Sequence, residues 1–216
     1  MSGSDVIIVL PGGGYRMHAP HEAEPVADWL DALGVATRVF RYPVGMRHPV
    51  PLEAVRATVR DARAAGARRV GLLGFSAGGH AAGMAALAPG ATAADRVDAA
   101  ILCYPVVSML LPTHVGSRAT LIGSGAGDTE RAATSLERLV TPDSPPFFIW
   151  HTAEDDVVPP VHSYLLGQAL AANGVAHELH MFPHGGHGLG FAQATPGAAE
   201  WPTLCEQWLR RSGWID

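Results

Sequence analysis

The sequence predicts an α/β protein with a mostly parallel sheet of about six strands and helices on both faces. Three observations lead to this fold class. Short apolar runs alternate with helix-like stretches, as in strands joined by crossover helices. Most of these runs are continuously apolar, which is typical of strands covered on both faces. Polar and glycine-rich motifs follow the runs, at the edge of the sheet where the carboxyl ends of parallel strands bind ligands.

The predicted strands and helices follow one another in regular order. The strands are Val6–Leu10, Ala36–Tyr42, Arg69–Phe75, Ala99–Tyr104, Phe147–His151 and Glu178–Phe182. The helices are Glu22–Leu33, Pro51–Ala65, Gly78–Ala88, Val161–Asn173 and a last one near Pro202–Arg210. The pair Asn173-Gly174 is a good helix stop, because glycine adopts the left-handed conformation that ends many helices.

The stretch from about Val106 to Pro146 is the least regular part of the chain. It contains the glycine-rich run 123–127 and shows little periodicity. It is too long for a simple connection and too short for a separate domain. We therefore expect an insertion over the active site with one short helix around Glu130–Leu139, and no large cap domain. No repeat or linker is visible, so the sequence predicts a single domain over residues 1–216.

The composition excludes several classes of partner. Hydrophobic residues make up 48% of the 216 residues and charged residues 16%, as in a globular protein. The formal net charge is −5 and the 15 basic residues, all arginine, form no run, so neither a nucleic-acid nor a membrane partner is expected. No signal peptide or membrane span is visible, which predicts a cytoplasmic protein. Cys103 and Cys205 form no disulfide framework. The oligomeric state is left open.

A nucleophile motif follows the third predicted strand. Residues 74–80 read Gly-Phe-Ser-Ala-Gly-Gly-His, which contains G-x-S-x-G around Ser76. A serine can attack a substrate from a tight strand-to-helix turn, and glycines two residues on either side relieve the crowding there. The motif follows an apolar strand and opens a helix, so it predicts Ser76 as a catalytic nucleophile rather than part of a glycine-rich turn.

A second glycine-rich motif, Pro11-Gly12-Gly13-Gly14-Tyr15, follows the first strand. It lacks the Gly-Lys-Ser/Thr of a phosphate-binding loop and completes no dinucleotide fingerprint. It fits an oxyanion hole like the H-G-G-G element of esterases, with proline in place of histidine. The expected donors are the N–H groups of Gly13 and Gly14, together with that of Ala77.

An acid and a base follow the last two strands. After Phe147–His151, the segment Glu154-Asp155-Asp156 offers three carboxylates, and the spacing before Val158-Pro159 favours Asp155, with Asp156 as its competitor. After the final strand, His187 lies between Gly186 and Gly188 and is favoured over His184 as the base. The chain order Ser76, Asp155, His187 is the order expected for this kind of triad.

The other histidines are expected to have supporting roles. His80 is predicted to pack or form hydrogen bonds on the elbow helix, and His151 to support the acid loop. The spacings of His18 with His21 and of His184 with His187 could suit a metal, but no matching carboxylates or cysteines complete a site. No metal site is therefore predicted.

Taken together, these residues resemble the small α/β-hydrolases similar to acetyl-xylan and feruloyl esterases and the wider acetyl esterase/lipase class. The matching segments are Pro11–Tyr15, Glu22–Ala27, Arg41–Tyr42, Gly74–His80, Cys103–Ser108, Pro145–Pro159 and Phe182–Phe191. The resemblance implies the α/β-hydrolase fold and hydrolysis of short acyl esters, such as acetate esters, without a cofactor. It assigns nucleophile, acid and base to Ser76, Asp155 and His187, and the oxyanion donors to Gly13, Gly14 and Ala77.

The chain departs from this resemblance in two respects. It begins almost directly at the oxyanion strand, which predicts a reduced N-terminus, and it lacks a signal peptide. These features favour a small-molecule ester or an internalised acetylated oligosaccharide over an extracellular polysaccharide. Three alternatives stay open: an acyltransferase with the same triad, a peptidase of the prolyl-oligopeptidase type, and a non-catalytic binding module on the same scaffold.

Overall fold

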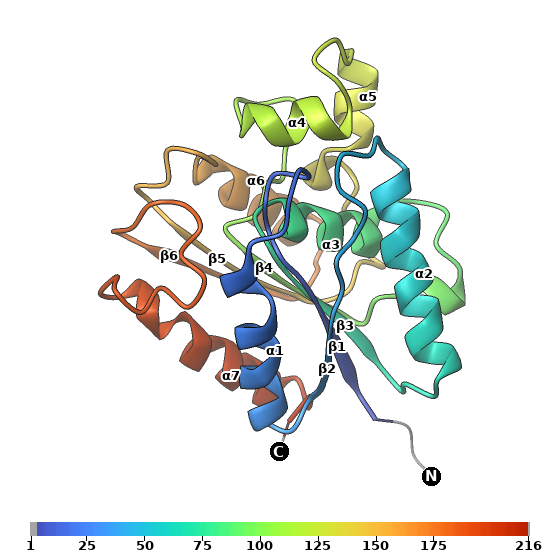
Figure 1. Cartoon of the computed structure of the whole chain (residues 1–216), viewed down its shortest axis with the longest axis vertical. Coiled ribbons are helices and arrows are strands. Elements are labelled where there is room, and N and C mark those ends of the chain that lie inside the picture. The colour runs from blue at the N-terminus through green and yellow to red at the C-terminus, as the bar shows by residue number, and fades with distance from the viewer. Residues whose placement is uncertain (1–3, 216) are drawn as a thin grey trace.

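The structure is a computed structural model that describes residues 4–215, and its centre is a sheet of six parallel strands (Figure 1). The strand order is β2-β1-β3-β4-β5-β6, and each neighbouring pair is parallel. The strands are β1 (Val6–Leu10), β2 (Ala36–Val39), β3 (Val70–Phe75), β4 (Ala99–Cys103), β5 (Phe147–Thr152) and β6 (His177–Phe182). The predicted fold class is confirmed, because all six apolar runs form strands of one parallel sheet.

Helices cover both faces of the sheet. The ones on one face are α1 (Glu24–Ala32) and α7 (Trp201–Arg211); the ones on the other are α2 (Val50–Ala64), α3 (Ala77–Leu87) and α6 (Val161–Ala172). Short 3₁₀ turns lie at Pro20–Glu22, Ala93–Asp95, Leu136–Arg138 and Ala198–Glu200. Among residues 4–215, no helix is both long enough and apolar enough to cross a lipid bilayer.

The two faces of the sheet bury two separate cores. On β1, Ile8 and Leu10 pack toward α2 and α3, whereas Ile7 and Val9 pack toward α1 and α7. This division follows from the alternation of side chains along a strand, and it requires apolar residues at every position of a central strand. The core beneath α7 is rich in aromatic rings: Trp201 stacks on Trp150 of β5 with ring centroids 5.3 Å apart.

The second strand differs from its prediction. The apolar run Ala36–Tyr42 forms a strand only as far as Val39, and burial along β2 alternates between exposed and half-buried positions. Because β2 is at the edge of the sheet, it pairs only with β1, and that pairing runs no further than Val9 and Val39. Beyond this point the chain leaves the sheet, and Tyr42 donates a hydrogen bond to the carbonyl oxygen of Pro11.

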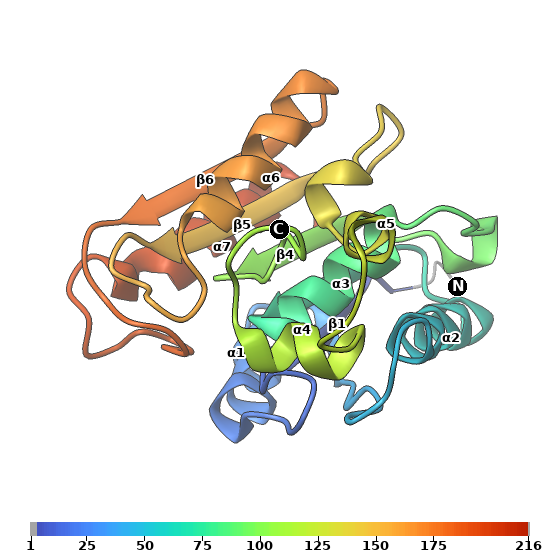
Figure 2. The same cartoon turned by 90° about the horizontal axis from the view of Figure 1, so that it is seen from above.

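The insertion contains more structure than predicted. Two short helices, α4 (Val115–Leu121) and α5 (Asp128–Ala133), lie over the carboxyl ends of the strands (Figures 1 and 2). The prediction of a single helix at Glu130–Leu139 is wrong, because the helical conformation ends with α5 at Ala133. The hydroxyls of Thr134 and Ser135 there donate to backbone carbonyls of α5, which competes with continuation of the helix.

Candidate active site

Ser76 occupies a tight turn between β3 and α3. Its φ and ψ of 52° and −115° lie in a region that side chains rarely adopt, and its relative exposure is 6%. The turn is held on both sides: the Ser76 N–H donates to the Cys103 carbonyl at 3.0 Å, and the Ser76 carbonyl accepts from the N–H of His80 at 3.0 Å. This strained geometry projects the hydroxyl beyond the carboxyl end of β3.

The glycines of the G-x-S-x-G motif permit this turn for a steric reason. A Cβ atom at Gly74 would lie 2.3 Å from the carbonyl oxygen of Gly78, and one at Gly78 would lie 2.2 Å from that of Leu10. Both distances are far below van der Waals contact and both involve backbone atoms. The spacing in the sequence therefore reflects the close approach of α3 to β1 and β3.

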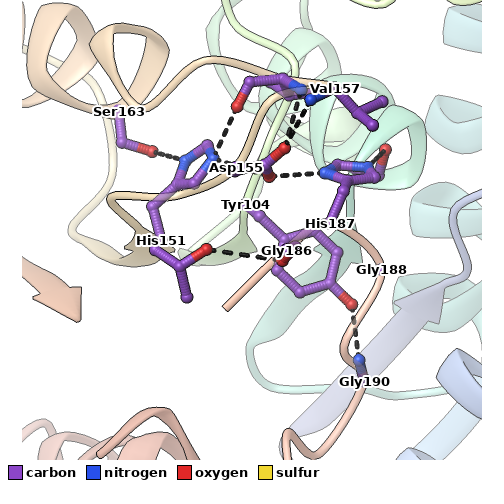
Figure 3. A network of polar contacts seen from close by, with 12 residues as sticks. Tyr104, His151, Asp155, Val157, Ser163, Gly186, His187, Gly188 and Gly190 are labelled. Carbon is purple, nitrogen blue, oxygen red and sulfur yellow. Dashed lines mark hydrogen bonds and ion pairs between the residues drawn. The ribbon is translucent and has the colours of Figure 1, made fainter. Parts of the chain in front are cut away.

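Ser76, His187 and Asp155 lie in hydrogen-bond contact, as the sequence predicts for a triad. The Ser76 hydroxyl donates to Nε2 of His187 at 2.7 Å, and Nδ1 of His187 donates to Oδ2 of Asp155 at 2.6 Å (Figure 3 shows the histidine and the acid). These partners define the neutral tautomer with the proton on Nδ1. The Nε2 atom is then free to accept the serine proton, which is the arrangement that a nucleophilic serine requires.

The carboxylate of Asp155 is buried, and both of its oxygens accept hydrogen bonds. Its Oδ1 accepts from the N–H groups of Val157 and Val158 at 3.0 and 2.9 Å, and its Oδ2 accepts from Nε2 of His151 at 3.1 Å. Burial opposes ionisation, but the hydrogen bonds from His151 and His187 outweigh it and hold the pKa of Asp155 well below its usual range. Asp155 is therefore a stable anion beside His187.

His151 supports the acid loop, as predicted from the sequence. Its Nε2 also donates to the Val158 carbonyl at 2.9 Å, so Nδ1 is unprotonated and accepts from the hydroxyl of Ser163 at 2.7 Å (Figure 3). The imidazole thus links β5, the acid loop and α6. This explains how the side chain of Asp155 keeps one orientation.

The two acids beside Asp155 take different positions. Asp156 is exposed to solvent and lies outside the triad. Glu154 is also exposed, and its carboxylate accepts hydrogen bonds from Nδ1 of His184 at 2.9 Å and from the N–H of Gly185 at 3.0 Å. Glu154 and His184 thus connect the acid loop to the loop that carries His187.

The glycine loop after β1 is held through its carbonyl groups. The Pro11 carbonyl accepts from the Tyr42 hydroxyl at 2.9 Å, the Gly12 carbonyl from the N–H of Ala19 at 3.0 Å, and the Gly13 carbonyl from that of Arg16 at 3.1 Å. These peptide bonds are trans, so each carbonyl points away from the N–H of the next residue. The N–H groups of Gly13 and Gly14 therefore point away from Ala19 and Arg16, the residues that bind the preceding carbonyls.

The expected oxyanion donors lie beside the serine. Among residues 4–215, the N–H groups of Gly13, Gly14 and Ala77 donate to no acceptor within the chain, whereas that of Gly12 donates to Glu22 at 2.8 Å. Gly13 and Gly14 have φ of 129° and 66°, which favour glycine. Gly13 and Gly14 line the same cleft as Ser76.

This cleft has a volume of about 520 Å³ and opens at the carboxyl edge of the sheet. Its walls come from the glycine loop, the segment before α1, the turn at Ser76, the residue that precedes α4, and the loops that carry Asp155 and His187. The residues that line it are Gly13, Gly14, Arg16, Met17, Ala19, His21, Glu22, Ser76, His114, Val157, His187 and Gly188.

Several residues of the site escaped the sequence analysis. His114, on the insertion, lies against the glycine loop: a Cβ atom at Gly14 would approach its Cε1 to 3.0 Å. Glu22 is only 2% exposed; the sequence predicts it at the start of a helix, but it lies in the 3₁₀ turn before α1. Tyr104 has a ring centroid 5.1 Å from that of His187. It directly follows β4, and this position at the carboxyl edge of the sheet is the signal that could have marked it as a site residue.

The remaining histidines have structural partners. His80 is fully buried; its Nε2 donates to the Thr134 carbonyl at 2.8 Å, and its Nδ1 accepts from the Tyr15 hydroxyl at 2.7 Å. The prediction that it packs on the elbow helix is confirmed. His18 packs edge-on against Tyr42. Within residues 4–215, no cluster of three or more His, Cys, Asp or Glu side chains is arranged to hold a metal ion.

Comparison with known proteins identifies the family. The model of the prolyl oligopeptidase family matches residues 52–211. An acetyl ester-xyloside bifunctional hydrolase from Caldicellulosiruptor lactoaceticus is 38% identical; the match covers 100% of this chain and 85% of that one, with a TM-score of 0.94.

Two curated relatives are longer than this chain. They are endo-1,4-beta-xylanase B of Butyrivibrio fibrisolvens, 35% identical, and an acetylxylan esterase of Xylanibacter ruminicola, 31% identical. Both matches cover 86% of this chain, but the chain spans only 32% and 41% of their respective lengths. With the parallel sheet and the nucleophile elbow, these matches show that the chain belongs to the prolyl oligopeptidase family and is an α/β-hydrolase similar to acetylxylan esterases.

Proposed function

We propose that the protein is a serine esterase that hydrolyses short-chain acyl esters, acetyl esters in particular, of a small molecule or sugar. The observation that carries this proposal is the continuous hydrogen-bond chain from Ser76 through His187 to Asp155. A serine hydroxyl in contact with an oriented imidazole and a buried carboxylate is the arrangement used for acyl transfer.

Acylation begins when the Ser76 oxygen attacks the ester carbonyl carbon and its proton passes to Nε2 of His187. The carbonyl oxygen becomes an oxyanion, which the N–H groups of Gly13, Gly14 and Ala77 stabilise. Each such donor typically contributes about 3–4 kcal/mol to the transition state. The tetrahedral intermediate then collapses: the bond to the alcohol breaks, and the leaving oxygen takes the proton from His187.

Deacylation repeats these steps with water. His187 accepts a proton from a water molecule, which attacks the acyl carbon of the Ser76 ester. Collapse of the second intermediate releases the acid and returns the proton to the serine oxygen. Asp155 stays anionic throughout and stabilises the imidazolium that forms in each half-reaction. No cofactor enters this scheme.

The relatives support the substrate class. Two of them carry acetyl ester or acetylxylan in their names. The open cleft of about 520 Å³, without a large cap, also suits a small acyl group. His114 of the insertion and the exposed Arg16, which follows the glycine motif, both line the cleft, so it offers polar groups to the alcohol portion of a substrate. We therefore propose acetylated sugars as the first substrates to test.

Covalent labelling and ester turnover test this proposal together. Wild-type protein is expected to react with a fluorophosphonate probe and to hydrolyse 4-nitrophenyl acetate, and Ser76→Ala to do neither. Unlabelled, inactive wild-type protein would favour a non-catalytic binding module. If the acyl group passes mainly to added alcohols instead of water, the protein is an acyltransferase. A panel of acetylated sugars and proline-containing peptides then defines the natural class of substrate.

A further inference from the structure

Glu22 is a buried carboxylate for which the mechanism above has no use. It lies in the 3₁₀ turn Pro20–Glu22 with a relative exposure of 2%. Its Oε2 accepts from the N–H of Gly12 at 2.8 Å, and its Oε1 accepts from the Tyr104 hydroxyl at 2.5 Å. Burying a carboxylate costs several kcal/mol unless its oxygens are paired. Both oxygens are paired here, and both partners belong to loops of the active site.

The hydrogen bonds continue from Tyr104 to the loop of His187. The Tyr104 oxygen accepts from the N–H of Gly190 at 2.8 Å, three residues after His187 (Figure 3). The tyrosine ring also lies edge-on to the His187 imidazole. A single buried chain of hydrogen bonds therefore runs from Gly12 on the glycine loop to Gly190 on the histidine loop.

A neighbouring residue makes a second connection between the same segments. Nε2 of His21 lies 2.9 Å from the Gly188 carbonyl oxygen. A Cβ atom at Gly190 would lie 2.8 Å from Cδ2 of His21, so the two segments are in direct contact. The 3₁₀ turn thus contacts the histidine loop at Gly188 and, through Tyr104, at Gly190.

We propose that Glu22 is a positioning residue that fixes the oxyanion loop and the histidine loop relative to each other. The inference rests on the esterase function proposed above. By accepting from Gly12, Glu22 holds the start of the loop whose Gly13 and Gly14 N–H groups have no acceptor among residues 4–215. Through Tyr104 and Gly190, the same carboxylate holds the backbone that follows the base. Preorganised donors of this kind act mainly on the transition state.

A carboxylate suits this position better than its amide analogue. Both hydrogen bonds to its oxygens come from donors, the Gly12 N–H on one side and the Tyr104 hydroxyl on the other. Glu22→Gln keeps the shape, but its amide nitrogen faces either the Gly12 N–H, which cannot accept, or the Tyr104 hydroxyl, whose own proton then has no acceptor. Tyr104→Phe breaks the same chain at its second link and keeps the buried ring.

The experiment compares Glu22→Gln and Tyr104→Phe with the matched control Glu24→Gln. Glu24 is exposed, lies two residues away and pairs with Arg41 on the surface. With 4-nitrophenyl acetate, we expect kcat to fall 10- to 100-fold in both test variants with KM changed less than threefold, and the control to match the wild type. Hydrogen–deuterium exchange should become faster in peptides covering 11–19 and 184–192 of both test variants, but not of the control.

The outcomes separate this inference from the proposed function. If the wild type turns over esters and the folded test variants retain its kcat and its exchange rates, the positioning role is overturned. If KM rises while kcat is retained, Glu22 acts in substrate binding and the inference is likewise wrong. If the wild type lacks esterase activity, the esterase proposal fails, and the exchange experiment alone decides whether Glu22 couples the two loops. Should Glu22→Gln not fold, Tyr104→Phe carries the same comparison.

Discussion

Four hydrogen bonds converge on the side chain of Asp155. Two backbone N–H groups bind one oxygen, and the imidazoles of His151 and His187 bind the other. All four partners are donors, so the position accepts an anion and disfavours any group that carries a proton. At the level of single residues, this is the strongest distinction between Asp155 and its exposed neighbour Asp156.

Asp155→Asn should lower kcat by about 10³- to 10⁴-fold, because an amide favours the wrong tautomer of His187. Steady-state hydrolysis of 4-nitrophenyl acetate measures the effect. Asp156→Asn is the matched control and should stay within about twofold of the wild type. Equal losses in the two variants would contradict the assignment of Asp155.

The buried imidazole of His80 makes stability depend on pH. Burial lowers its pKa from 6.5 to about 4, because a charge at this position would be removed from water. Between these two values the unfolded chain binds a proton that the folded protein does not, so stability falls as the pH falls. The shift corresponds to about 3 kcal/mol at most, lost progressively from pH 6.5 down to pH 4.

His80→Gln should remove this part of the acid sensitivity. Glutamine can still bond to the Thr134 carbonyl or the Tyr15 hydroxyl, but it does not titrate. Urea unfolding at pH 7.5 and at pH 4.5 gives the free energy of unfolding of both proteins. The variant is expected to be less stable at pH 7.5 and to lose about 2–3 kcal/mol less than the wild type on acidification. An unchanged loss would show that other groups govern the acid response.

At the level of elements, the site depends on how closely α3 approaches the sheet. The first turn of α3 lies against the end of β1, where Gly78 leaves no room for a Cβ atom beside Leu10 and Pro11. Neither backbone can move aside without disturbing the elbow at Ser76 or the glycine loop. The same packing therefore positions both Ser76 and the glycine loop.

Gly78→Ala should destabilise the protein by about 3 kcal/mol or more, because its Cβ would lie 2.2 Å from the Leu10 carbonyl oxygen. Thermal unfolding and soluble yield measure this effect. Gly125→Ala, in the insertion, is the matched control: no atom lies within 4 Å of its added Cβ, so the melting temperature should change little. A stable, fully active Gly78→Ala variant would contradict the packing argument.

A buried histidine of α6 holds the start of the insertion against the body of the protein. His162 of α6 accepts hydrogen bonds from the N–H groups of Val107 and Ser108 at 3.0 and 3.1 Å, and its Nε2 donates to the Pro112 carbonyl at 3.0 Å. The start of the insertion is thereby held against α6. Further along the insertion, the N–H of His48 donates to the Leu121 carbonyl at the end of α4, at 2.8 Å.

At the level of the whole molecule, the parallel sheet gathers segments that are far apart in the chain. Ser76 and His187 are 111 residues apart, and His187 and Asp155 are 32 residues apart. Each follows the carboxyl end of a strand, and in a parallel sheet these ends share one edge. The cleft forms where that edge meets the insertion.

The size of this cleft leads to a prediction about acyl length. Because the cleft is small, open and without a large cap, kcat/KM should be highest for acetate and propionate esters and fall for longer chains. A series of 4-nitrophenyl esters from acetate to decanoate provides the measurement. Better turnover of the decanoate than of the acetate would contradict this view of the cleft.

Much of this architecture could be predicted from local sequence. The strands of the central sheet are continuous apolar runs, and the glycines around Ser76 are required by the elbow itself, so both features appear in the sequence. The predictions were weaker where local signals compete. The edge strand β2 is shorter than its apolar run, and the insertion contains a helix, α4, whose seven residues include Gly116 and Thr120.

By itself, the sequence determined the fold class and the order of the strands along the chain, and it predicted Ser76, His187 and one of three adjacent acids as site residues. These features depend on periodicity and on short motifs, which are local properties. Only the tertiary structure decided which of three adjacent acids faces His187, which glycine N–H groups stay free, and that Glu22 joins two loops through Tyr104. These depend on contacts between segments far apart in the chain, and a buried carboxylate that bridges two loops leaves no periodic signal in the sequence.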